Sequence, residues 1–225
     1  MKSRIIARQP YSPETIIIVD DGRLPKELLD MHKQRIDTIF AKQTEQYRNE
    51  QLNKVIMHDI LFSKAMDFLS RQYEFDIHPE DVEEYQKFIL GNNPIPTDQN
   101  VLASLKIAAT QQIIKDLIFN DIKERNNITV TDEELEKVLL SYYQQTNQPI
   151  RNFKNDKNSY ENARMSILSE KIVNHILSSF KFDLDKFNKQ VEEMMKKVEA
   201  PTITEFVKST SVNVAPVKSA PVNVA

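Results

Sequence analysis

Cysteine is absent from this 225-residue sequence, and glycine occurs only twice, at Gly22 and Gly91. Without cysteine the chain can form no disulfide, thiolate metal site or thiol nucleophile, which fits a reducing compartment, so we expect the cytoplasm. Average glycine usage of about 7% would give roughly sixteen residues in a chain of this length. The phosphate-binding loops of nucleotide enzymes need several glycines within a few residues, so these enzyme classes are excluded.

A dominant charge and a long apolar run are also missing. The 30 basic residues nearly balance the 33 acidic ones, for a formal net charge of −3, so no global field attracts nucleic acid or anionic lipid. A nucleic-acid binder would be retained on DNA in a salt-sensitive way, and the charge balance argues against that function. The apolar run Ile16–Val19 is too short for a signal-peptide core or a membrane span, so we expect no membrane association.

What the sequence does contain is a set of long stretches without proline, in which long helices fit. The first stretch, Lys26–His78, carries apolar residues three and four apart, which predicts an amphipathic helix. Its polar part, Lys42–Gln51, predicts a solvent-exposed bridge between two packed regions. A continuous helix of about fifty residues would span roughly 75 Å, which is longer than an ordinary compact domain.

The next two stretches repeat one unit, which consists of a short helix, a loop and a long helix. The first copy opens at Ile77-His78-Pro79 and ends in a helix at about 97–125, and the second opens at Val130-Thr131-Asp132 and ends in a helix at about 159–180. Such a helical pair buries its apolar face more easily as a projecting arm than within one globule. We therefore predict an all-α, elongated multi-helix fold with a long linking helix and two projecting helical arms, at about 76–125 and 128–180.

Both ends of the chain differ from its middle. Residues 1–24 mix isoleucines with prolines, which predicts an extended N-terminal segment packed along the helices, with a short strand as one option. Residues 200–225 are mostly Ser, Thr, Val, Ala and Pro, and they repeat the tetrapeptide Val-Asn-Val-Ala. That composition cannot nucleate a core and predicts a disordered tail. The expected helical domain thus covers residues 25–199.

No constellation typical of catalysis or of metal binding emerges. The acidic clusters Glu80-Asp81, Glu83-Glu84 and Asp132-Glu133-Glu134 each lie at the start of a predicted helix, where carboxylates stabilise exposed amides by about 0.3 to 1 kcal/mol each. Thr131 and Glu134 have the spacing of a capping box. No serine lies in a nucleophile elbow, and the four histidines are far apart in the sequence. We expect no enzyme activity, no metal and no cofactor.

Apolar side chains exceed what arms only two helices thick can cover. We select nine of them as candidates for binding other polypeptides, because methionine repacks easily and tyrosine joins an apolar face to a polar tip. They are Tyr85, Phe88, Ile89, Leu90, Tyr142, Tyr143, Met165, Met194 and Met195. The alternative for each of them is an ordinary place in the core.

Three segments carry a resemblance to a known family. They are Arg48–Leu69, Phe75–Val82, and Ile128–Leu135 with the downstream Gln148-Pro149. In order and spacing they resemble the linking helix, first arm and second arm of the C-terminal chaperone domain of trigger factor, and more distantly the helical core of SurA-type chaperones. The resemblance covers about residues 26–180 and implies a cradle that transiently holds unfolded chains. Neither the ribosome-docking domain nor the prolyl isomerase domain of trigger factors has a counterpart here, so neither activity is expected.

Two functions stay open at this point. The first is an ATP-independent holdase, with unfolded or nascent polypeptides as clients and other chaperones as further partners. Its contacts would be diffuse, so its affinity for any one segment should be weak. The second is a helical adaptor or structural protein that clamps one dedicated folded partner. Binding to many unrelated unfolded chains would favour the holdase, and a single stoichiometric partner would favour the adaptor.

Overall fold

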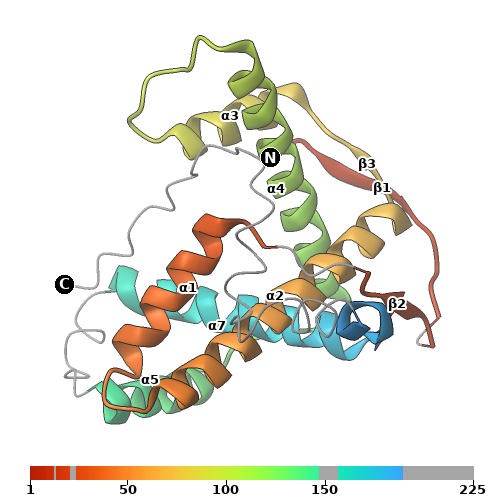
Figure 1. The fold of residues 1–225 in the computed structure, drawn as a ribbon. Helices are drawn as coiled ribbons and strands as arrows, with labels where there is room; N and C mark the ends of the chain where they lie inside the picture. The colour runs from red at the N-terminus through yellow and green to blue at the C-terminus, as the bar shows by residue number, and fades with distance from the viewer. Residues whose placement is uncertain (13, 21–23, 147–156, 190–225) are drawn as a thin grey trace.

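Helices dominate the computed structural model, which describes residues 1–12, 14–20, 24–146 and 157–189 (Figure 1). The helices are α1 (Lys26–Ile39), α2 (Glu45–Gln72), α3 (Pro79–Leu90), α4 (Gln99–Arg125), α5 (Asp132–Thr146) and α7 (Lys157–Ser178). Short strands accompany them: β1 (Arg4–Arg8), β2 (Ile16–Ile18), β3 (Tyr73–Asp76) and β4 (Lys181–Asp183). The fold is mainly helical rather than all-α: the short strand kept as an option for residues 1–24 is present there as β1 and β2, whereas β3 and β4 were not predicted. The predicted tail at 200–225 lies outside the described residues.

The long helix predicted for the first stretch is in fact two helices. A turn at residues 40–44 separates α1 from α2, and Thr44 caps α2 by accepting a hydrogen bond from the main-chain N–H of Tyr47 at 3.2 Å. The turn lets α1 pack against α2, where Leu29 and Leu52 belong to one buried cluster. Because α1 buries its apolar face in this way, the linking helix is α2 alone, with 28 residues and a length of about 42 Å.

The strands tie the N-terminal segment to distant parts of the chain. β1 pairs with β3 in an antiparallel register from Arg4 opposite Asp76 to Arg8 opposite Tyr73, with an irregularity at Ile6. β2 pairs with β4 in parallel. The N-terminal residues thus lie along the helical body as one strand of each of two small sheets.

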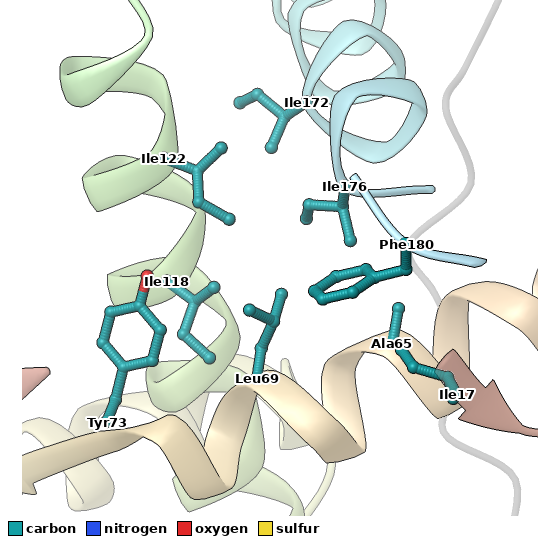
Figure 2. Packing of buried hydrophobic residues seen from close by; sticks show 9 residues of the cluster. All are labelled: Ile17, Ala65, Leu69, Tyr73, Ile118, Ile122, Ile172, Ile176 and Phe180. Carbon is teal, nitrogen blue, oxygen red and sulfur yellow. The ribbon is translucent and has the colours of Figure 1, made fainter. Parts of the chain in front are cut away.

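A shared core joins α2, α4, α7 and β2. Leu69 from α2, Ile118 from α4 and Ile176 from α7 are at most 1% exposed. Figure 2 shows these side chains pointing toward one another, with Ile17 reaching in from β2 near Ala65. The long helices of the two repeated units therefore meet in one apolar cluster.

Each repeated unit also has a smaller core of its own. Val82 of α3 packs with Ala109 and Ile113 of α4, and Leu135 of α5 packs with Ile167 of α7. The helices α4 and α7 consequently have two apolar faces each. One face covers the short partner helix, and the other lies in the shared core.

Candidate polypeptide-binding surface

An exposed isoleucine on α4 lies on the helix face that leads to the shared core. Ile114 and Ile118 follow Ile107 by 7 and 11 residues, close to two and three helical turns, so the three side chains lie on one face. Ile118 is fully buried and Ile114 packs at the margin of the shared core, whereas Ile107 is 59% exposed. The apolar stripe of α4 therefore continues beyond the core into solvent.

The same arrangement recurs on α7 with the same spacing. Ile172 and Ile176 follow Met165 by 7 and 11 residues and lie in the shared core, but Met165 is 57% exposed. Both stripes lead into the shared core. Ile107 and Met165 therefore lie on the faces of α4 and α7 that point toward this core. Met165 was selected from the sequence, whereas Ile107 was not. The spacing of Ile107 ahead of two apolar residues was the signal that could have found it.

A second exposed apolar group lies where α3 leads into α4. Phe88 near the end of α3 is 79% exposed, Ile95 in the connecting loop is 69% exposed, and Val101 in the first turn of α4 is 37% exposed. Figure 1 places this connection at the far end of the pair from the shared core. Among the described rings, Phe88 has only Tyr85 as a neighbour, in an edge-to-face arrangement with the ring centroids 6.5 Å apart. Phe88 was selected from the sequence, whereas Ile95 and Val101 were not.

Two of the other selected residues, Tyr85 and Ile89, help to hold α3 against α4. Tyr85 and Ile89 pack on the cluster around Val82, and Leu90 is half-buried. The Tyr85 hydroxyl donates a hydrogen bond to Asp116 of α4. Burial, followed by this hydrogen bond, raises the pKa of Tyr85 to about 12, so the phenol keeps its proton.

The other selected residues have no described side chains. Tyr142 and Tyr143 lie in the last turns of α5, where the structure describes the backbone alone. Met194 and Met195 lie outside the described residues. Their role in binding stays a prediction.

The N-terminus of the chain anchors the start of α3. Asp81 is only 4% exposed and accepts hydrogen bonds from the main-chain N–H groups of Lys2 (2.7 Å) and Ser3 (2.5 Å) and from the Ser3 hydroxyl (2.6 Å). The hydroxyl bond from Ser3 is the main cause that holds the pKa of Asp81 below its ordinary value. From the sequence alone Asp81 was identified only as a helix-start carboxylate, because its partners lie 78 or more residues away.

A second polar anchor joins β1, β3 and α4. The buried carboxylate of Asp121 accepts from Arg8 (2.6 Å) and Arg125 (2.9 Å), and the Tyr73 hydroxyl donates to it at 2.9 Å. Burial and this hydrogen bond raise the pKa of Tyr73, which keeps the phenol a proton donor. The two anchors fix the base of the α3–α4 pair, so its exposed apolar residues are presented from a supported element.

The acidic start of α5 forms the predicted capping box. The Glu134 N–H donates to the Thr131 hydroxyl at 3.2 Å, and the Thr131 N–H donates to the Glu134 carboxylate at 3.0 Å, which confirms that prediction. In the part of the chain that the structure describes, no group of three or more His, Asp or Glu side chains could hold a metal ion. None of the described helices is both long and apolar enough to cross a membrane.

Comparison with known proteins identifies the family of the chain. The family model described as the C-terminus of bacterial trigger factor matches residues 41–178. The chain belongs to the trigger factor C-terminal family. This membership confirms the resemblance inferred from the sequence and points to a chaperone-like role, since the C-terminal part of trigger factor is its chaperone part and not a catalytic one.

This trigger-factor-like chain matches nearly the whole length of some relatives but only a third of others. The uncharacterized protein MG377 of Mycoplasma genitalium is 28% identical over 182 residues, which cover 81% of this chain and 93% of that protein. The trigger factor of Azospirillum brasilense is 25% identical over 149 residues, which cover 59% of this chain but only 33% of that protein. The crystal structure of the hypothetical Mycoplasma protein MPN555 superposes with a TM-score of 0.69 at 26% identity, over 81% of this chain and 91% of that one.

Proposed function

We propose that this chain is an ATP-independent holdase that binds unfolded or nascent polypeptides. The observation that carries the proposal is the pair of apolar stripes on α4 and α7. Each stripe runs from the shared core to an exposed residue, Ile107 or Met165. Contiguous exposed apolar surface is typical of sites where other polypeptides bind. Membership of the trigger factor C-terminal family supports the same function.

In this proposal α3–α4 and α5–α7 act as two arms, and residues 25–199 form the client-binding domain. The small separate cores around Val82 and Leu135 support the arms, because each pair packs around residues of its own. Figure 1 shows α3 and α5 at different ends of the molecule. Clients would lie along the inner stripes and at the exposed group formed by Phe88, Ile95 and Val101. The selected residues Tyr142, Tyr143, Met194 and Met195 belong to the same proposal.

The test is suppression of aggregation, measured by light scattering. Two unrelated denatured enzymes are diluted into buffer with increasing amounts of the chain and without ATP. We expect suppression of both, and a weaker effect for Met165→Ser. The matched control is Met31→Ser on α1, because Met31 is 47% exposed but does not lie on either stripe. If the chain suppresses neither enzyme at several-fold excess, the holdase function is wrong. A single stoichiometric folded partner would then favour the adaptor.

A further inference from the structure

Among the described residues, the outer edge of β2 has no strand partner. Thr15 O accepts from Lys181 N at 3.2 Å, and Val19 N donates to Asp183 O at 2.9 Å. Since main-chain groups of alternate residues point to opposite edges of a strand, these bonds put Thr15, Ile17 and Val19 toward β4. The N–H and C=O groups of Ile16 and Ile18 then face outward. Within the described residues, no strand pairs with that edge.

The side chains at these two positions are apolar and exposed. Ile16 is 59% exposed and Ile18 is 52% exposed, while Ile17 between them is buried in the shared core. Parallel sheets are normally covered on both faces, so a two-stranded parallel sheet with two exposed isoleucines is unusual. A free apolar edge of this kind is a ready template for another strand.

The edge of β1 shows what protection against strand addition looks like in the same molecule. β1 has an irregularity in its register at Ile6 and an arginine at each end, Arg4 and Arg8. Bulges and charged residues are common devices that keep edges from pairing. The uncharged segment Thr15–Val19 has neither device.

We propose that the outer edge of β2 binds an extended, uncharged segment of a client polypeptide by strand addition; this inference rests on the proposed holdase function. Charged side chains beside the edge are already engaged, since Asp20 pairs with Lys64 at 2.7 Å and Glu14 pairs with Lys181. An uncharged segment therefore suits the edge better than a charged one. Recognition through main-chain groups is independent of the client sequence.

The short length of β2 favours such a segment over a second copy of the chain. A stable interface between two proteins buries roughly 1,200 Å² or more, and an edge of three residues offers far less. Two outward N–H groups and two outward C=O groups suffice for weak, reversible binding of one segment. Weak binding is what a chaperone that must release its clients requires.

The experiment compares Ile18→Pro with Ile18→Ala in the full chain. Both variants lose the isoleucine side chain, but only proline removes the outward N–H. Proline is tolerated at edge positions whose N–H faces solvent, so thermal unfolding should be similar in both variants. The probe is a short, fluorescently labelled, uncharged peptide of alternating valine and threonine, followed by fluorescence anisotropy. A second probe has the same sequence with N-methyl groups on its central residues.

We expect Ile18→Pro to bind the unmethylated peptide about fivefold more weakly than Ile18→Ala, the effect of one main-chain hydrogen bond. The N-methylated peptide should not bind the unaltered chain. Equal affinities of the two variants would overturn the inference. Equal binding of the two peptides would overturn it as well, even if Ile18→Pro failed to fold.

Other occupants of the edge give distinct results. If a second copy occupies it, sedimentation will show a dimer that Ile18→Pro dissociates, with no change in peptide binding. If residues 190–225 of the chain occupy it, the full chain will not bind the peptide at all. Either result overturns the inference. Should peptide binding not depend on Ile18 while aggregation suppression persists, strand addition fails and the holdase function stands.

Discussion

Two isoleucines on one face of α4 distinguish the core from the proposed binding surface. Ile118 is fully buried among side chains of α2 and α7, whereas Ile107, three turns earlier, is 59% exposed. Truncation to alanine removes the same atoms at both positions. The two variants therefore compare the same chemical change in two environments, on one helix and one helix face.

The expected magnitudes differ widely. Burial makes Ile118→Ala cost the transfer free energy of the lost atoms and a cavity, about 3 kcal/mol within a usual range of roughly 2 to 5. Ile107→Ala should change the free energy of unfolding by about 0.5 kcal/mol or less, as exposed positions do. In a chain of this size about 3 kcal/mol corresponds to a fall in Tm of roughly 6 to 12 °C.

Urea denaturation followed by circular dichroism measures both effects. We expect the midpoint of Ile118→Ala to fall without a change in slope, and that of Ile107→Ala to stay close to the unaltered chain. Ile107→Ala should instead weaken the suppression of aggregation. If Ile107→Ala were as destabilising as Ile118→Ala, the Ile107 side chain would be buried in solution. The apolar stripe of α4 could then not be a binding surface.

Three further changes test the anchors and the helix cap. Because the pKa of Asp81 lies below its ordinary value of 3.8, its ionised form stabilises the fold above that pH, and this stabilisation is lost as the pH falls through the lowered pKa. When both proteins are titrated below about pH 4, the unfolding free energy of Asp81→Asn should therefore fall less than that of the unaltered chain. An equally steep fall would contradict this. Tyr73→Phe should lower the unfolding free energy by about 1 kcal/mol in urea denaturation, because a buried carboxylate loses one donor; no change would show that the phenol is dispensable. Thr131→Ala should cost about 1 kcal/mol in the same assay, whereas Thr129→Ala, two residues outside the capping box, should be neutral.

The sequence predicted the helices well where the periodic pattern of apolar residues extends over many turns. The repeated order of short helix, loop and long helix corresponds to α3–α4 and α5–α7, since each long helix carries apolar residues over many turns. The turn between α1 and α2 was missed, although Thr44 is a good cap ahead of Glu45. A polar gap in a helical pattern fits both a solvent-exposed helix and a turn. Only the packing of α1 against α2 decides between them.

The pairing of the strands and the polar anchors could not be predicted from local patterns. β3 follows α2 directly, and its partner β1 lies at the other end of the sequence. Likewise, Asp81 looks like any helix-start carboxylate until Ser3 is placed beside it. Such elements are stabilised by contacts between residues far apart in the chain, so short segments carry little trace of them. The same reasoning explains why Tyr85 and Ile89 resembled free binding residues: their partners on α4 were not visible in the sequence.

The unequal size of the cores has a consequence for how a holdase of this kind would work. The core between α5 and α7 contains Leu135 and Leu139 as its buried residues in the described part of the chain, whereas the shared core extends over three helices and a strand. Elements with few buried contacts open at a lower free energy than the core to which they are attached. In the proposed holdase, the two helical pairs would then adjust to different client segments, while the shared core and the anchors at Asp81 and Asp121 would keep their bases in place. In this way binding surfaces that are adaptable can be combined with a fixed spacing between them, which a holdase for varied clients needs.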